Sequence, residues 1–409
     1  MPLAALIAAQ ENLESGGGLR ATLPLVGRTL IEHQVNVAVR AGAGRIILLV
    51  ERVPAALAQA IDRLRRDGVS IEAARSVSDA ADRFHPDDDV LLIGDGCIAG
   101  QGVVDLLVGT DAPAVLVLPD TSEQAMFERI DPESRWAGFA LITGASLQDT
   151  SRMLGDWDLT STQLRRSIQE GARRIDALGP GADGEPGSQP IIAVDKGALT
   201  LLERSLLRRP PVAGGNWADL YIHRLIGAPL IGPLILRRVQ PLHLALGSAA
   251  VAGIGALAAI AGYFWLAALS MPVAAATFSM ARQMARIWAA EVPHIRSLLI
   301  VRQIAALVAL AMLARHLGLP GEWGWWIVAA IVPLGLVGLA ALRPVARSLA
   351  VAETPIWLPA TDGLIWITPA LAILTGWGGM LCVLAGYCAV GFGWQIRLLR
   401  MAAMEKGRE

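Results

Sequence analysis

The distribution of charge is the feature that most constrains how this chain can fold. Residues 1–210 carry most of the aspartates and glutamates, whereas long runs between Ile226 and Arg400 contain no acidic residue. Hydrophobic residues make up 54% of the 409 residues, which is too high for an ordinary soluble protein. We therefore expect a soluble N-terminal half followed by a membrane-embedded C-terminal half.

The totals exclude several other classes of protein. The chain has 35 basic and 36 acidic residues, so it lacks the overall positive charge of a nucleic-acid-binding protein. Its three cysteines, Cys97, Cys382 and Cys388, are scattered and form no metal-binding or disulfide pattern. We expect them to be small buried hydrophobic side chains.

The N-terminal half alternates strand and helix patterns. "LAALIAA", "GRIILLV" and "DDDVLLI" are continuous apolar strands, and "VPAALAQAIDRLRRDG" is an amphipathic helix that ends at a glycine. This alternation predicts a mostly parallel, Rossmann-like α/β sheet over residues 1–177. Ligands of such sheets bind beyond the carboxyl ends of the strands, where "ENLESGGGLRA" and "GDG" are expected to lie.

The stretch "IAAQENLESGGGLRATLPLVGRTLIEH" resembles the opening of the MobA-like nucleotidyltransferases. The resemblance implies that the loop glycines Gly16, Gly17 and Gly18 surround a nucleotide with backbone N–H groups. It implies that Arg20 neutralises the phosphates. Asp95 falls where the family places a Mg²⁺-binding aspartate, so Mg²⁺ is expected in this half only.

This stretch departs from the family pattern at three positions. Ala9 and Gln10 stand where the family has its first two glycines, and Glu14 stands in place of an arginine. The reversed charge at Glu14 would face a polyphosphate. Two readings follow, retained nucleotidyl transfer or a scaffold domain that has lost it.

Residues 178–190 are rich in Gly, Pro and Ser, which predicts a flexible linker. In residues 191–240 apolar positions are interleaved with arginines. This pattern predicts helices in the membrane interface with their arginines toward anionic headgroups. A soluble helix packed on the α/β domain is the alternative.

Residues 241–400 contain apolar runs long enough to cross a bilayer. The six runs span approximately 241–263, 265–288, 298–317, 324–342, 357–376 and 378–397. Arginines gather at alternate ends of these runs, and the positive-inside rule then places both termini in the cytoplasm. We expect a multi-pass protein of the cytoplasmic (inner) membrane that is in contact with membrane lipids.

The order of the two halves resembles the fused nucleotidyltransferase/CDP-alcohol phosphatidyltransferase proteins, which include bifunctional enzymes of CDP-inositol and di-inositol phosphate phosphate synthesis. The stretch "NWADLYIHRLIGAPLIGPLI" is similar to the lead-in helix of that family, with His223-Arg224 at its Asn-Arg pair. The resemblance implies a homodimer, a nucleotide or CDP-alcohol ligand, and a role in phospholipid headgroup synthesis.

The signature of the membrane family is D-x-x-D-G-x-x-A-R-(x)8-G-x-x-x-D-x-x-x-D, whose four carboxylates hold two divalent metal ions. We anchored this signature on Ala285-Arg286 in "FSMARQMAR". The four carboxylate positions then hold Phe278, Ala281, Leu299 and Gln303. Glu291 is the only acid in residues 278–303, and one carboxylate cannot hold two Mg²⁺ ions in the usual way. The sequence therefore predicts that metal-assisted transfer is lost.

Basic residues stand in and around the region that the missing carboxylates would occupy. The candidate phosphate- or headgroup-binding residues are Arg224, Arg282, Arg286, Arg296 and Arg302. The alternative is that these arginines only mark the cytoplasmic side. Asp362, at the start of the fifth run, is either a functional intramembrane acid or a helix cap.

Two functions remain open. The first is a CDP-alcohol phosphatidyltransferase-type enzyme of headgroup synthesis with divergent chemistry. The second is a non-catalytic membrane scaffold or regulator that binds a lipid, a nucleotide or an enzyme partner. A transporter is supported only by the number of spans.

Overall fold

The structure is a computed structural model of the chain. It describes residues 2–13, 18–153, 158–179, 189–194, 196–208, 217–237, 239–290, 292, 294–319, 321–348 and 355–406. The chain divides into two compact units. The α/β unit comprises Met1–Arg209 with Ala285–Glu291, and the helical unit comprises Pro210–Met284 with Val292–Glu409. Most of the predicted linker, residues 180–188, lies outside the described residues.

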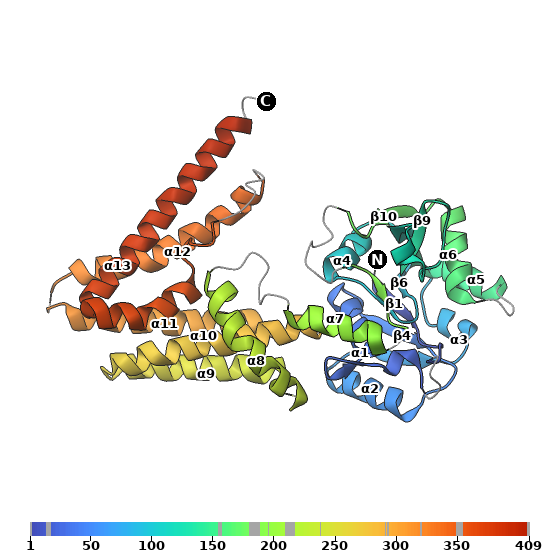
Figure 1. Cartoon of the computed structure of the whole chain (residues 1–409), viewed down its shortest axis with the longest axis horizontal. Coiled ribbons are helices and arrows are strands. Elements are labelled where there is room, and N and C mark those ends of the chain that lie inside the picture. Colours follow the sequence, from blue (N-terminus) through green and yellow to red (C-terminus); the bar gives the residue numbers. More distant parts are fainter. Residues whose placement is uncertain are drawn as a thin grey trace. The chain divides into compact units, whose positions relative to one another are not determined.

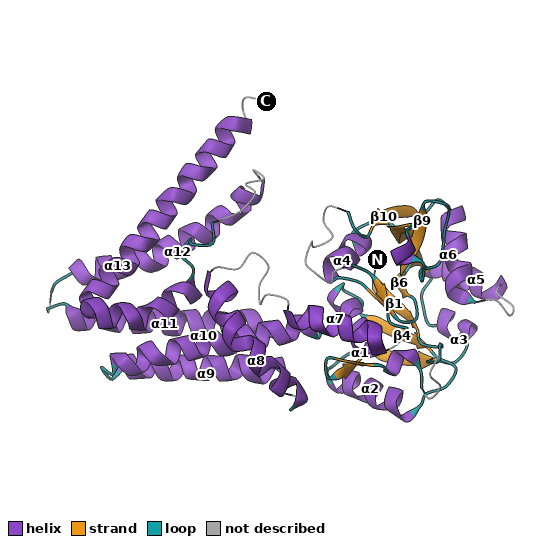
Figure 2. Cartoon of the chain, viewed as in Figure 1, coloured by secondary structure: helices purple, strands orange, loops and turns teal. Residues whose placement is uncertain are grey.

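A seven-stranded sheet forms the centre of the α/β unit (Figure 2). Its strands, in spatial order, are β10 (Arg173–Asp176), β8 (Ala114–Pro119), β9 (Ser134–Thr143), β6 (Asp89–Ile93), β1 (Leu3–Ala8), β4 (Arg45–Leu49) and β5 (Ile71–Ala74). All neighbouring pairs are parallel except those of β9, which runs antiparallel to both β6 and β8. The predicted mostly parallel α/β sheet is confirmed.

Alternate residues of the central strands enter two separate cores, because successive side chains of a strand point to opposite faces. In β1, Ala5 and Ile7 join the core beneath α1 (Leu30–Arg40), α2 (Ala55–Arg66) and α4 (Gln101–Val108). On the other face, Ala4 and Leu6 join the core beneath α3 (Val77–Ala81), α5 (Gly144–Met153) and α6 (Leu159–Gln169). Burial on both faces explains why these strands are continuous apolar runs.

Short elements complete the α/β unit. Two antiparallel strand pairs, β2 (Pro24–Leu25) with β3 (Arg28–Thr29) and β7 (Cys97–Ile98) with β11 (Ile191–Ile192), flank the sheet, and 3₁₀ turns span Arg20–Thr22 and Ser122–Gln124.

Helix α7 (Lys196–Arg208) also belongs to the α/β unit. Its residues Leu199, Leu202 and Leu206 are buried, and the Glu203 carboxylate accepts the backbone N–H of Val26 at 2.6 Å. This helix therefore takes the packed position, which was the alternative to a place in the membrane interface.

The helical unit begins with a π-helical turn (Ala218–His223), which continues into α8 (Arg224–Leu236). The longer helices are α9 (Pro241–Ile260), α10 (Phe264–Ile287), α11 (Ile295–Leu317), α12 (Gly324–Ser348) and α13 (Thr361–Lys406). In the part of the chain that the structure describes, these five are long and apolar enough to cross a membrane. Helix α10 is the most enclosed, since 67% of its most apolar window is buried.

Helix α13 is broken at Gly376, whose backbone has φ 69° and ψ 175°. Only glycine adopts this conformation readily. Figure 1 shows the segments before and after the break running in different directions. The break falls at the junction that the sequence predicts between a fifth and a sixth run.

Candidate functional site

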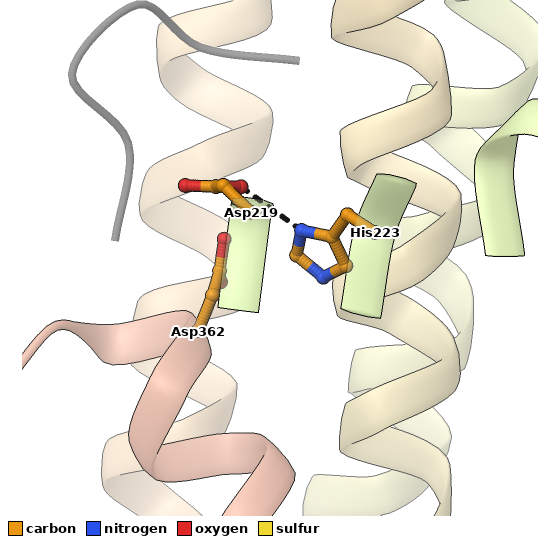
Figure 3. Close-up of side chains that lie close together, drawn as sticks. All are labelled: Asp219, His223 and Asp362. Atoms are coloured by element: carbon orange, nitrogen blue, oxygen red, sulfur yellow. Dashed lines mark hydrogen bonds and ion pairs between the residues drawn. The ribbon is translucent and has the colours of Figure 1, made fainter. Parts of the chain in front are cut away.

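The candidate site of the helical unit contains an Asp–His pair on the π-helical turn. Asp219 and His223 are four residues apart, and both are buried, with 5% and 2% of their surfaces exposed. The Asp219 carboxylate lies 2.9 Å from His223 Nδ1 (Figure 3). Because His223 Nε2 accepts the indole N–H of Trp366 at 2.9 Å, the ring proton lies on Nδ1 and is donated to Asp219. Both ring nitrogens are therefore engaged.

A second buried carboxylate, Asp362, comes from the first turn of α13 and lies beside this pair (Figure 3). Arg302 of α11 donates to its Oδ1 at 2.6 Å, and only 3% of the Arg302 side chain is exposed. Arg282 of α10 lies 3.5 Å from Asp362 Oδ2 and 3.7 Å from Asp219 Oδ1. The two arginines and two aspartates therefore balance in charge. We call Asp219, His223, Arg282, Arg302 and Asp362 the buried ion network.

Phe278 lies against both guanidinium groups of this network. The Arg302 guanidinium is 4.9 Å and that of Arg282 is 5.4 Å from the centre of its ring. A cation over an aromatic face is attracted to the ring quadrupole. Phe278 holds the position at which the signature of the family that the sequence resembles has its first carboxylate, and in this structure its ring lies against cations.

The ligand atoms of Asp219, His223 and Asp362 lie within 4.8 Å of one another, close enough to hold a metal ion. The surrounding charges oppose this use. Two guanidinium groups already neutralise the two carboxylates, and a divalent ion would leave an uncompensated positive charge in a buried site. A metal would also have to displace the hydrogen bonds of His223. The residues present fit an ion-pair network better than a metal centre.

Three nitrogens of the network lack a hydrogen-bond partner among the described residues. They are Arg302 Nε, Arg302 Nη1 and Arg282 Nε, and all three are buried. Phe278 explains in part why these nitrogens have no partner, because a guanidinium that lies over a ring turns some of its nitrogens away from polar groups.

Among the four candidate arginines whose side chains are described, the structure brings Arg282 and Arg302 together around Asp362. Arg296 is exposed near the start of α11, and Arg286 lies half-buried in the last turn of α10, in a segment that belongs to the α/β unit. The side chain of Arg224, the first residue of α8, lies outside the described atoms. Asp362 is not a simple cap, since its carboxylate contacts both network arginines.

Asp219 and Trp366 are the two site residues that the sequence analysis did not single out. Asp219 is the one acid in "NWADLYIHR", and its spacing to His223 puts both side chains on one side of a helical turn. An isolated acid in an apolar region was therefore a usable signal. Trp366 gave none, because an apolar helix contains many aromatic residues.

In the α/β unit, Asp95 follows β6 at the edge where ligands were expected. Its Oδ2 accepts the backbone N–H groups of Gln10 and Glu11, both at 2.7 Å, while its Oδ1 is buried and has no partner in the described part of the unit. Burial raises the pKa of this carboxyl from 3.8 to about 6. A cavity of about 430 Å³ lies beside it, lined also by Arg20 and Trp136.

Arg20 enters this cavity but is already paired. Its guanidinium lies 2.6 Å from Glu11, and its buried Nε has no hydrogen-bond partner among the described residues. The side chain packs against Gly96, where an added Cβ would come within 2.5 Å of Arg20 Cδ. Gly18 is described, whereas the candidate glycines Gly16 and Gly17, like Glu14, lie outside the described residues.

The acids lining this cavity outnumber its cations. Glu11, Asp95, Glu128 and Asp158 line it together with Arg20 as the one basic residue of the described lining. Glu128 and Asp158 are tied to the start of α6 through Ser161. A bare polyphosphate would be repelled here unless a metal ion accompanied it.

The comparisons with known proteins found similarity to solved structures only. No family model and no curated protein matches the sequence. The inositol-1-phosphate CTP transferase from T. maritima is 12% identical with a TM-score of 0.37, over 49% of this chain and 95% of that chain. A likeness of this size carries no argument about fold or function.

Proposed function

We propose that this chain is a multi-pass membrane protein of the CDP-alcohol phosphatidyltransferase type whose helical unit does not catalyse transfer. In this account it is a scaffold or regulator of phospholipid headgroup synthesis. The order of the two halves and the resemblance in residues 217–303 support the family type. The buried ion network supports the loss of chemistry.

The Arg302–Asp362 ion pair is the observation that carries this proposal. Two-metal phosphate transfer needs carboxylates that are free to coordinate cations. Here the buried carboxylate of Asp362 is held at 2.6 Å by an arginine of which only 3% is exposed. Breaking this pair to admit a metal would leave a buried guanidinium without a counter-charge, which is costly in a low-dielectric site.

The Asp–His pair does not restore catalysis. A general base needs a free lone pair within reach of the proton that it removes. In this structure the Trp366 indole occupies His223 Nε2, and the ring proton is directed at Asp219. His223 is thus a positioning group that orients Asp219.

A second candidate function, nucleotide binding by the α/β unit, is favoured by the unpartnered Oδ1 of Asp95 beside the 430 Å³ cavity. The Mg²⁺ ion that the MobA-like resemblance implies fits this oxygen. Mg²⁺ at nucleotide sites is held by one or two carboxylates and completed by phosphates and water. Asp95 would hold the ion, which would neutralise the phosphates among these acids.

Nucleotide binding is tested with the purified full chain. Titration with CTP and with GTP in the presence of Mg²⁺ should show binding that weakens at least about tenfold in Asp95→Asn, on the scale of one charged contact. Asp62→Asn, an exposed acid of α2, is the matched control and should leave binding unchanged. If the wild-type chain binds neither nucleotide, the α/β unit is a scaffold as well.

Loss of transfer is tested by release of CMP. We would incubate the full chain with Mg²⁺, CDP-diacylglycerol or CDP-inositol, and a panel of alcohol acceptors, and expect no CMP above the protein-free blank. Metal-dependent CMP release that disappears in Asp219→Asn, but persists in Asp95→Asn, would place chemistry in the helical unit and overturn the proposal.

A further inference from the structure

A cavity inside the helical unit lies apart from the buried ion network and has no role in the proposed function. It has a volume of about 460 Å³, opens to the outside of the unit and is lined by α10, α11, α12 and α13. Its walls are mostly apolar; Met271, Leu310, Val332 and Leu336 are representative lining residues. A cavity of this size and lining is typical of a site that binds a small apolar group.

Three polar lining residues gather at one end, and a fourth, Thr368, lies about two turns further along α13. Gln303 lies in the first half of α11, Arg343 in the last two turns of α12 and Thr361 at the first residue of α13. The opposite end is aromatic. There Phe264, the first residue of α10, packs against His316 near the end of α11 and against Trp377 just after the break in α13. The cavity is therefore amphipathic along the helix axes.

The length of the cavity matches one leaflet of a bilayer. Its lining runs along α11 from Gln303 to Leu313, about 15 Å at 1.5 Å per residue. The hydrocarbon core of a bilayer is about 30 Å thick. An apolar occupant of this length that also reaches a polar end has the dimensions of a lipid chain that enters from one side.

Arg343 indicates which kind of lipid headgroup fits beside the cavity. It is the one ionisable residue among the described lining residues, and no carboxylate of the described chain pairs with it. An exposed guanidinium beside an apolar cavity is complementary to a lipid phosphate at the membrane surface. The Gln303 amide and the Thr361 hydroxyl add two neutral donors for ester or phosphate oxygens.

We propose that this cavity binds one acyl chain of a membrane phospholipid, whose phosphate is held by Arg343. The site requires the membrane location of the proposed function but not the loss of transfer. Failure of this proposal and failure of the non-catalytic proposal are therefore separate results, one measured by bound lipid and the other by CMP release.

The occupant is tested by native mass spectrometry of the full chain, extracted in mild detergent and then exposed to phosphatidylglycerol, oleate or inorganic phosphate. We expect the wild-type chain to retain one phosphatidylglycerol through delipidation. Arg343→Gln should weaken that binding at least about tenfold, on the scale of one charged contact. Arg400→Gln, an exposed arginine of α13 that does not line the cavity, should not change it.

A second pair of variants tests the volume of the cavity independently of the charge of Arg343. Ala306→Phe fills the cavity from α11 and should prevent lipid retention, whereas Ala330→Phe, at an exposed alanine of α12 outside the lining, should not. Equal retention by wild type and Ala306→Phe would overturn the proposal. The proposal would also be overturned if phosphatidylglycerol did not bind while oleate or inorganic phosphate bound in a way that depends on Arg343. If Ala306→Phe does not fold, the Arg343→Gln comparison decides.

Discussion

Phe278 lies against two guanidinium groups of the helical unit. The resemblance places a metal-binding carboxylate at this residue, and the structure holds Arg282 and Arg302 over its ring. The counter-charges come from Asp219 and Asp362, which lie on other elements. At the residue scale, acids are present but are used to neutralise arginines.

A double-mutant cycle measures the energetic coupling between Arg302 and Asp362. Arg302→Met leaves the buried Asp362 carboxylate with Arg282, at 3.5 Å, as its remaining cation, so we expect a loss of about 3–5 kcal/mol in stability. The double variant Arg302→Met with Asp362→Leu restores neutrality and should recover most of that loss. Stability would be measured by denaturation in detergent, with Arg296→Met as an exposed control. Strictly additive losses would show that the pair is not coupled.

The Asp95 carboxyl gives a prediction about pH. Since burial raises its pKa to about 6, the folded chain binds the proton more tightly than the unfolded chain. Stability relative to Asp95→Asn should therefore fall by up to about 3 kcal/mol as the pH rises from about 4 to about 6, and then stay level. Calorimetry of both chains across this range measures the difference.

Asp131 is a control, because its contribution to stability should change with pH in the opposite direction. The backbone N–H of Glu133 and the hydroxyl of Ser134 lower the pKa of this partly exposed acid to about 2. Its contribution should be present above about pH 4 and disappear as the pH falls toward 2. A wild-type chain whose stability relative to Asp95→Asn rises between pH 4 and 6 would contradict the buried position of Asp95.

The break in α13 is the feature that matters most at the scale of elements. The sequence predicts two runs, 357–376 and 378–397, and the structure separates them by the backbone of Gly376 rather than by a loop. Glycine is needed there for its conformation and not for space, because an added Cβ would meet nothing within 4 Å.

Substitution of this glycine tests the break. Gly376→Ala should destabilise the helical unit by about 1–3 kcal/mol, because alanine is strained at φ 69° and ψ 175°. Gly386→Ala is the matched control in the same helix; its added Cβ also meets nothing within 4 Å, and it should be neutral or stabilising. Equal midpoints for the two variants in thermal denaturation would mean that α13 is continuous.

The elements were predicted more fully than the site, for a physical reason. Periodicity and apolar runs report which faces are buried, so the strands of the sheet and the long helices could be read from the sequence. The network depends on Asp219, Arg302 and Asp362, which are far apart in the chain and meet only through packing of α11 and α13 with the π-helical turn. Local sequence patterns do not predict contacts between residues that are far apart in the chain.

At the scale of the whole molecule, the break in α13 divides the five long helices of the described residues into six apolar segments. Six crossings of a membrane would return both ends to one side. We propose that this side is the cytoplasm, where the arginine-rich ends of the segments are retained. The homodimer that the resemblance implies is part of the same proposal.

Cysteine labelling checks this topology. In a chain with Cys382→Ser, a membrane-impermeant maleimide should label Leu319→Cys from outside intact cells, and should label Met404→Cys only after permeabilisation. Both positions are exposed, at 69% and 63%. Labelling of Met404→Cys from outside would contradict the proposed orientation.

The central claim is that the helical unit uses its buried carboxylates in ion pairs and not as metal ligands. Binding of Mn²⁺ to the purified Asp95→Asn chain, followed by the paramagnetic resonance signal of the free ion, tests this claim most directly. The account predicts no stoichiometric Mn²⁺ binding, with or without the further change Asp219→Asn. One or two Mn²⁺ ions per chain that are lost in Asp219→Asn would contradict it.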